Sequence, residues 1–334
     1  MLILSAEDVA SLLDLDRLVD SLEVAMTDVS AGRLSMPART AAYVAERHGL
    51  LGVMPAHLPA AKALVCKLVS VFPDNRDVAS HQAVICCFDS SNGTPVAVMD
   101  GTHVTAVRTA AGSALATRLL ARADARVVTV IGAGVQAAAH GRALSRLPGV
   151  ELILLAGRDR HRVRTLAAQL AADGVNATAS DTIESAVREA DVVCATTHAA
   201  EPVLSRAWLR PGTHVNSVGY NVTGAGEIDQ DTVNDSLVVV ESRAVALAPP
   251  PAGAVELRAA LETGTLRAED TAEIGEIAAG TRRGRTDESQ LTLYKSVGVA
   301  AQDAAAAALV LDAARERGIG QEVHLEAPRR PRSA

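Results

Sequence analysis

Three observations predict an α/β fold for this sequence of 334 residues. A β-branched apolar run over 126–131 stops at two closely spaced glycines, and an alanine-rich segment with the composition of a helix begins directly after them. Further short apolar runs alternate with helical segments, which is typical of parallel strands joined by crossover helices. The preceding part of the chain holds strand-like segments of its own. We therefore predict a Rossmann-type dinucleotide-binding domain and a second domain of mixed α+β structure.

The glycine turn is the element with the clearest chemistry. Gly132 permits a tight turn after the strand, and Gly134 lets a pyrophosphate approach the backbone. The free N–H groups at the start of the next helix can then bind phosphate oxygens, assisted by the helix dipole. Ala137 or Ala138 replaces the usual third glycine and is small enough for a helix to pack on a strand. This context predicts a bound dinucleotide.

The segments around this turn are predicted to form a parallel sheet. The expected strands cover 126–131, 150–155, 191–195, 214–218 and 236–240. One helix is expected over 161–172. A second helix, ending at residue 190, is expected to have Asp181 as its N-cap and Glu184 as the capping-box partner. The ligand of such a sheet is expected beyond the carboxyl ends of its strands.

The N-terminal part needs an architecture of its own. Its apolar residues have helical spacing between Val9 and Met26. A hairpin turn is expected at 89–93, and a long helix over 105–122 leads into the dinucleotide-binding part. The expected strands cover 39–44, 50–54, 63–71, 82–89 and 95–99.

The domains are expected to be discontinuous in sequence. A last helix over 297–317, closed by Gly318, is expected to pack back onto the N-terminal sheet. We therefore predict that residues 1–118 and 300–334 together form the substrate-binding and dimerisation domain. Residues 119–299 are expected to form the Rossmann-type domain.

Composition argues against several classes of partner. The formal net charge is −7 and the isoelectric point is about 5.7, which argues against nucleic acid and anionic membranes as partners. Aromatic residues make up 2% of the chain, so base-stacking surfaces are scarce. The first residues lack the features of a signal peptide, and no apolar run is long enough to span a bilayer. We expect a cytoplasmic protein with neither a nucleic-acid nor a membrane partner.

The four cysteines have the spacing of neither a disulfide framework nor a zinc site, so no metal is expected. Cys86 and Cys87 are adjacent in an apolar run and should point to opposite faces of a strand. Buried, unreactive thiols are therefore expected.

Three basic residues stand where apolar ones would be usual. Lys67 interrupts an otherwise apolar strand, and a buried ammonium needs either a carboxylate partner or an anionic ligand. Arg108 lies in a helix of small residues, where its guanidinium could grip a carboxylate with two hydrogen bonds. Arg39 is a third candidate. Each alone is more often salt-bridged, but together, in one domain beside a dinucleotide fold, they suggest a site for a small anionic substrate.

With these residues in place, the chain resembles the ornithine cyclodeaminase/mu-crystallin family from about Met36 to Gly320. The resemblance rests on the segments 52–56 (GVMPA), 67 with 72–75 (FPDN), 100–111 with its RTAA, 131–136 (IGAGVQ), 211–219 (PGTHVNSVG) and 292–298 (TLYKSVG). It implies a nucleotide-binding domain and a mixed domain whose sheets pair in a homodimer. Family members include ornithine and lysine cyclodeaminases, amino-acid dehydrogenases and ketimine reductases, and a mammalian member binds thyroid hormone.

The resemblance implies a role for each matching residue. Arg39, Lys67 and Arg108 match residues that hold the substrate carboxylate, and Gln82 matches a position near the carboxylate and the nicotinamide. The implied chemistry is hydride transfer at an amino or imino α-carbon, where a lysine can polarise the imine and exchange protons. The implied cofactor contacts are Gly132, Gly134, Val135, Gln136, Thr197, Val218 and Ser296.

One segment departs from the family pattern. Asn221 stands where cyclodeaminases carry an aspartate proposed as acid and base, and Ala225 stands in place of a cofactor-contacting lysine. An amide cannot accept a proton at neutral pH, so deamination with ring closure loses its expected base. We expect an altered catalytic role for Asn221, which could still orient an amine or imine. The alternative is a loop residue tolerant of left-handed geometry.

Cofactor preference is set at the end of the second strand of such a fold. Arg158 is at the first exposed position there and favours the 2′-phosphate of NADP(H), whereas Asp159 leaves NAD(H) possible. We expect an NAD(P)-dependent oxidoreductase acting at the Cα–N bond of a small amino or imino acid. Within enzymes, the alternative is an ornithine or lysine cyclodeaminase that releases ammonia. Outside enzymes, the alternative is an NADP(H)-bound small-molecule-binding protein with little turnover.

Overall fold

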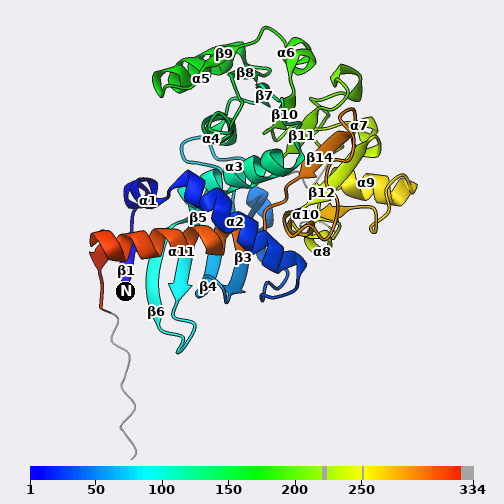
Figure 1. Ribbon diagram of the computed structural model, residues 1–334. Helices are drawn as coiled ribbons and strands as arrows, with labels where there is room; N and C mark the ends of the chain where they lie inside the picture. The colour runs from blue at the N-terminus through cyan, green and yellow to red at the C-terminus, as the bar shows by residue number, and fades with distance from the viewer. Residues whose placement is uncertain (220–223, 250–251, 325–334) are drawn as a thin grey trace, which may run out of the picture.

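The computed structural model describes residues 1–219, 224–249 and 252–324. In this part of the chain two sheets form, and each occupies its own half of the molecule (Figure 1). No helix within these ranges combines the length and the hydropathy that crossing a membrane requires.

The N-terminal half contains a mixed sheet. Its strands pair antiparallel from β2 to β6, and β1 pairs parallel with β6. The order across the sheet is β15 (Gln321–Glu322), β1 (Leu2–Leu4), β6 (Pro95–Asp100), β5 (His81–Phe88), β4 (Ala63–Val71), β3 (Gly49–Leu58) and β2 (Thr40–Val44).

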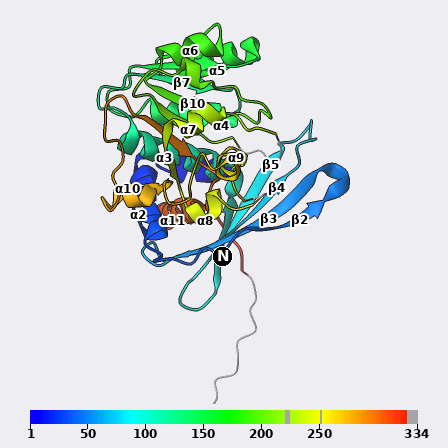
Figure 2. The ribbon, with the colours of Figure 1, turned by 90° about the vertical axis from the view of Figure 1, so that its right-hand side faces the viewer.

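Helices cover one face of this sheet. α3 (Gly101–Leu120) and α11 (Ala300–Arg317) pack on its strands, and α2 (Leu15–Ser30) packs on both helices. Figure 2 shows α2 and α11 on one side of strands β3 to β5. The last long helix therefore lies on the N-terminal sheet, as expected. The domain boundaries themselves stay a prediction, and the one between 118 and 119 falls within α3.

The face under the helices contains one continuous row of buried side chains. Met54, Lys67, Ile85 and Met99 are neighbours across four strands. All four are buried, and Lys67 is only 2% exposed. An ammonium group thus stands in the middle of an apolar row.

The second half contains a parallel sheet, as predicted. Every pair of neighbouring strands in it is parallel. The order is β13 (Ala272–Glu273), β12 (Ser236–Val240), β14 (Leu291–Lys295), β11 (His214–Ser217), β10 (Val192–Ala195), β7 (Val127–Ile131), β8 (Leu152–Ala156) and β9 (Ala177–Ala179). The remaining helices are α1 (Ala6–Leu12), α4 (Val135–Leu144), α5 (Arg160–Ala172), α6 (Ile183–Glu189), α7 (Gln230–Asn234), α8 (Arg243–Ala246), α9 (Val255–Thr263), α10 (Ile274–Ala278) and the short 3₁₀ helices Ala45–Arg47 and Arg206–Trp208.

Helix starts account for most of the differences from the expected elements. The N-terminal helical pattern divides into two helices, because Asp14 caps α2 by accepting the Arg17 N–H. Helix α6 is capped by Thr182, so the assignment of Asp181 as N-cap was wrong. Asp181 instead pairs with Arg160.

Two further differences concern a strand and two thiols. No strand was expected at β14, because this strand contains a buried lysine, a threonine and a tyrosine in place of an aliphatic run. The thiols of Cys87 and Cys194 are buried as expected, but Cys66 and Cys86 are half-buried, because they face away from the covering helices. Cys86 and Cys87 do lie in opposite rows of β5.

Candidate functional site

The turn after β7 has the backbone that a dinucleotide site needs. Gly132 has φ +133°, and a Cβ placed on it would lie 2.6 Å from the Thr196 hydroxyl, so glycine is required there. A Cβ placed on Gly134 would meet nothing within 4 Å among the described residues. Gly134 is the N-cap of α4 and has no side chain to accept the first N–H groups of the helix, which can therefore bind phosphate oxygens.

The first residues of α4 also fit a bound dinucleotide. Val135 is 71% exposed, although it is a large apolar residue. The side-chain oxygen of Gln136 is buried and has no hydrogen-bond partner in the described part of the chain. Both features are explained if a ligand covers this turn. Gly132, Gly134, Val135 and Gln136 are therefore the residues that would hold the pyrophosphate.

Arginines surround the end of the neighbouring strand. Arg158 is exposed two residues after β8, and Arg162 donates a hydrogen bond to the carbonyl of Ala133 in the glycine turn. Asp159 accepts the N–H groups of His161 and Arg162 as the N-cap of α5. The carboxylate of Asp159 is thus engaged by its own helix, while Arg162 contacts the turn.

The other strand ends are held by two buried glutamates that the sequence did not single out. Glu227 accepts the N–H and hydroxyl of Thr197 at 2.8 and 2.9 Å. Glu241 accepts the Ser296 hydroxyl at 2.6 Å. The Val218 N–H donates to the carbonyl of Ala195. Thr197, Val218 and Ser296 therefore lie at the carboxyl ends of β10, β11 and β14, the edge where Gly132 ends β7.

The basic residues of the N-terminal half meet on a single carboxylate. Lys67 Nζ lies 2.7 Å from Asp303 Oδ2, and Arg108 Nε lies 3.1 Å from Asp303 Oδ1. Arg108 also donates to the side-chain oxygen of Gln302 at 2.8 Å. The side chain of Asp303 is fully buried in α11. The carboxylate partner that Lys67 required is therefore Asp303.

Burial and charge together set the protonation of this cluster. Burial lowers the pKa of Lys67 from 10.5 to about 8, and the positive charges of Arg108 and Arg39 lower it as well. The charge of Asp303 acts in the opposite direction and raises the pKa of Lys67. For Asp303 burial acts to raise the pKa, but Lys67 and Arg108 outweigh it and hold it below the usual value. Lys67 can consequently gain and lose a proton close to neutral pH.

Arg39 bridges the two halves of the molecule. Its Nη2 donates to the carbonyl oxygens of Ala252, Val297 and Gly298, at 3.0, 3.1 and 3.3 Å. Val297 and Gly298 belong to the turn after β14. Arg39 and Arg108 both act on the pKa of Lys67, so the structure brings the three cations together.

Gln82 and His81 differ in their positions on β5. The residues of β5 that face the helices are Ala83, Ile85 and Cys87, so His81 continues that row and Gln82 belongs to the opposite one. The amide of Gln82 donates to the carbonyl of Ala79 at 3.2 Å. Burial, followed by the charges of Lys67 and Arg108, lowers the pKa of His81 to about 4. The role of Gln82 toward a substrate stays a prediction, while the pKa of His81 responds to the charges of the cluster.

A family model describing the ornithine cyclodeaminase/mu-crystallin family matches residues 1–318. The chain belongs to this family. Ketimine reductase mu-crystallin from Mus musculus is 36% identical over 315 residues, which cover 92% of this chain and 96% of the relative.

Two solved structures have the same fold. The Δ1-pyrroline-2-carboxylate reductase of Thermococcus litoralis, in complex with NADH and L-proline, has a TM-score of 0.92 at 33% identity, covering 97% of this chain and 100% of that one. An archaeal alanine dehydrogenase dimer with bound NAD has a TM-score of 0.89 at 29% identity, covering 98% and 99%.

The family segment that departs in sequence is only partly described. Asn221 lies outside the described residues, so its altered role stays a prediction. On either side of it, the Gly219 N–H donates to Glu227 at 2.6 Å, and the Ala225 N–H donates to the carbonyl of Ala200 at 2.8 Å. Glu227 itself thus anchors the start of this family loop.

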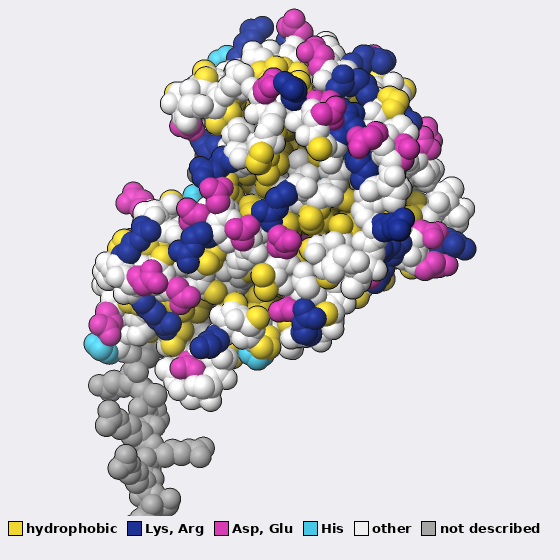
Figure 3. Space-filling view, viewed as in Figure 1, with side chains coloured by type: hydrophobic (Ala, Val, Ile, Leu, Met, Phe, Trp, Pro, Cys, Tyr) yellow, Lys and Arg dark blue, Asp and Glu magenta, His cyan; other side chains and the backbone are white. Residues whose placement is uncertain are grey.

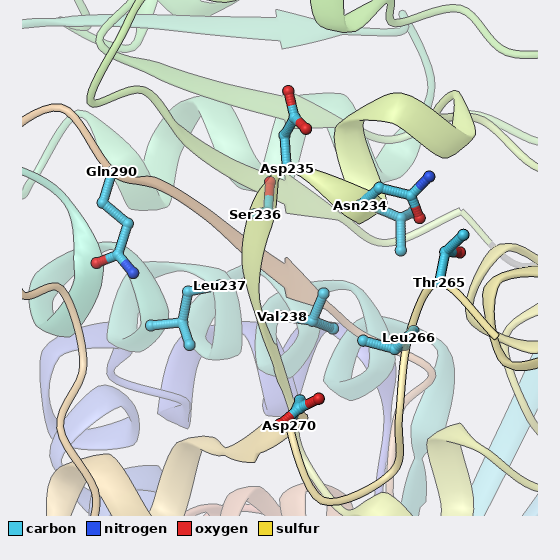
Figure 4. Close-up of a pocket in the computed structure, with 10 residues that line it drawn as sticks. Asn234, Asp235, Ser236, Leu237, Val238, Thr265, Leu266, Asp270 and Gln290 are labelled. Carbon is cyan, nitrogen blue, oxygen red and sulfur yellow. The ribbon is translucent and has the colours of Figure 1, made fainter.

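A separate surface pocket lies away from this family site. It has a volume of about 370 Å³ and is lined by residues 233–238, 265, 266, 270 and 290 (Figure 4). Ser236 begins β12 and Gln290 precedes β14, so the pocket is at the amino ends of these strands, at the sheet edge opposite the glycine turn. Acidic and basic side chains are interspersed over the face of the molecule in Figure 3.

Proposed function

We propose that this protein is an NAD(P)-dependent reductase of small α-imino acids, forming the corresponding amino acids. The observation that carries this proposal is the buried cluster of Lys67, Arg108 and Asp303, packed against the turn after β14. Lys67 and Arg108 share the single carboxylate of Asp303, and Arg39 adds a third positive charge nearby, so the site is complementary to an anionic substrate. The relatives named as ketimine and pyrroline-2-carboxylate reductases support the same reaction class.

Each residue of the cluster would have a distinct part in that reaction. The reduced nicotinamide, when bound, supplies the hydride to the imine carbon. Lys67, with its pKa of about 8, donates a proton or hydrogen bond to the imine nitrogen, which makes the carbon more electrophilic. Arg108 and Arg39 bind the substrate carboxylate and orient the carbon. Asp303 holds Lys67 and Arg108 in place. Its charge also raises the pKa of Lys67, so the lysine keeps its proton up to a higher pH.

A pair of imines that differ only in the carboxylate tests this assignment. We expect Δ1-pyrroline-2-carboxylate to be reduced with oxidation of the nicotinamide, and Δ1-pyrroline to be reduced poorly. The expected loss is about 10³-fold in kcat/KM, because the cations would be left without their anion. Equal rates with the two imines would contradict the role of the cluster.

The cofactor preference is proposed to be NADP(H). Arg158 and Arg162 supply positive charge near the end of β8, and Asp159 is committed to capping α5. We expect Arg158→Asp to shift the ratio of the dissociation constants toward NADH by about tenfold, since it replaces attraction for a 2′-phosphate by repulsion. An unchanged ratio would assign the preference to other residues.

A homodimer and a cytoplasmic location complete the proposal. The sheet face away from the helices exposes Leu51 and Val84 at 45% and 42%, an apolar surface suited to a second copy of the sheet. Val84→Glu is expected to give a monomer in light scattering.

All four cysteines are free thiols, which fits the reducing cytoplasm.

A further inference from the structure

A buried carboxylate that directly follows β12, Glu241, holds the turn on which both halves of the site meet. Glu241 is fully buried. Its Oε1 accepts hydrogen bonds from the Ser296 hydroxyl at 2.6 Å and the Gly298 N–H at 3.1 Å. Its Oε2 accepts the Val297 N–H at 3.2 Å. One side chain therefore fixes three consecutive residues after β14.

The peptide unit between Val297 and Gly298 connects Glu241 to Arg39. In a trans peptide the N–H and the C=O point in opposite directions. The N–H of this unit, from Gly298, donates to Glu241, and its C=O, from Val297, accepts a hydrogen bond from Arg39 at 3.1 Å. The carboxylate and the guanidinium thus bind opposite edges of one peptide plane. Hydrogen bonds aligned in this way strengthen one another in a buried environment.

The same turn contacts Arg108. Gly298 has φ +72°, and a Cβ placed on it would lie 2.7 Å from Nη1 of Arg108. The carbonyl of Gly298 also accepts from Arg39 at 3.3 Å. A shift of this peptide would therefore move the support of Arg39 and open the contact with Arg108. The position of both arginines depends on the orientation that Glu241 gives the turn.

Another buried glutamate of the same half makes a useful comparison. Glu256 is 1% exposed and accepts a hydrogen bond from the Lys295 ammonium at 3.1 Å. It also accepts the N–H of Glu227 at 3.1 Å. The hydrogen bonds of Glu256 therefore support the loop before α7, whereas those of Glu241 support the turn that contacts Arg39 and Arg108.

We propose that Glu241 is a positioning residue that sets, through the 297–298 peptide, where Arg39 holds the substrate carboxylate. This inference rests on the proposed function, in which Arg39 binds that carboxylate. It assigns Glu241 an effect on substrate binding that is transmitted by Arg39 and is absent when Arg39 is absent.

A double-mutant cycle tests the transmission. Glu241→Gln, Arg39→Leu and the double variant are assayed with Δ1-pyrroline-2-carboxylate at saturating NADPH. Glutamine keeps one oxygen acceptor but presents an NH₂ group to one of the two backbone N–H groups, so the turn must reorient. We expect Glu241→Gln to raise KM about tenfold with kcat within about twofold, and to raise it less than about twofold in the Arg39→Leu background. Glu256→Gln is the matched control and should change KM by the same factor in both backgrounds.

The outcomes separate the two levels of the proposal. The same increase of KM by Glu241→Gln in both backgrounds would show a general structural effect and overturn the positioning role. An Arg39→Leu variant with unchanged KM would overturn the carboxylate contact in the proposed function, and the inference with it. If the glutamine variant does not fold, Glu241→Asp, which keeps the charge on a shorter side chain, enters the same cycle with the same two interpretations.

Discussion

The two sheets of the molecule accommodate buried charge in different ways. In the parallel sheet, Glu227 and Glu241 lie just beyond strand ends and accept hydrogen bonds from the backbone N–H groups and hydroxyls of nearby residues. In the N-terminal sheet, Lys67 lies in the middle of a strand and is satisfied by the side chain of Asp303 from a distant helix. Backbone-bonded carboxylates fix the shape of loops, whereas an ion-paired lysine with a pKa of about 8 keeps a proton that it can exchange. The parallel sheet thus builds the loops at the edge of the site, and the N-terminal sheet supplies the reactive lysine.

The largest effect is expected from removing that reactive group. Lys67→Met keeps most of the side-chain volume in the apolar row and leaves Asp303 paired with Arg108. We expect kcat/KM for the imino acid to fall about 10³-fold, because the imine loses its proton donor. Circular dichroism and the Tm show whether the variant is folded. A folded variant with near-normal kcat/KM would make Lys67 a structural residue.

The turn after β7, on the parallel-sheet side of the site, is tested by two glycines that lie two residues apart. Gly134→Val adds a side chain to space that no described atom occupies, so we expect the fold to tolerate it and the dissociation constant for NADPH to rise about 100-fold. Gly132→Ala is the contrasting variant. Its φ of +133° and the nearby Thr196 predict a loss of about 1–3 kcal/mol in the free energy of unfolding. Unchanged NADPH binding by Gly134→Val would place the pyrophosphate elsewhere.

Features of the fold and the site were predictable where the residues that form them are close together in the sequence. The glycine turn directly follows its strand, so the adjacent residues predicted it. Local apolar runs predicted the parallel strands. Asp303 was visible only as a charge at the end of an alanine-rich segment, because its partner Lys67 lies in another element at the far end of the chain. Glu241 escaped for the same reason, since its role depends on the turn after β14. Helix α11 starts at Ala300, three residues later than expected, because Glu241 holds residues 296–298 in a turn.

A moderate effect is expected at the ion pair that joins α11 to the N-terminal sheet. The charge of Asp303 raises the pKa of Lys67, so Asp303→Asn should lower that pKa further. Because the protonated lysine is the active form, activity is lost as pH rises through its pKa, and the alkaline limb of kcat/KM should move to lower pH. A pH profile with an unmoved alkaline limb would show that Lys67 does not control it.

The smallest effect concerns helix α6, far from the reactive cluster. Thr182→Ala removes the hydroxyl that accepts the Ser185 N–H, and we expect a loss of about 1 kcal/mol in the free energy of unfolding. Asp181→Ala is the matched control at the adjacent exposed position and should destabilise less in the same denaturant titration. A larger loss from the aspartate variant would reverse the assignment of the cap.

The stoichiometry of the nicotinamide tests the proposed reaction most directly. The unmodified protein is supplied in parallel with Δ1-pyrroline-2-carboxylate plus NADPH, and with ornithine plus a catalytic amount of NAD(P). A reductase consumes one nicotinamide for each proline formed from the imine and releases little ammonia from ornithine. We predict this result. Efficient conversion of ornithine to proline and ammonia without net change in the nicotinamide would contradict the account and identify a cyclodeaminase, while tight NADPH binding with no turnover of either compound would identify a binding protein.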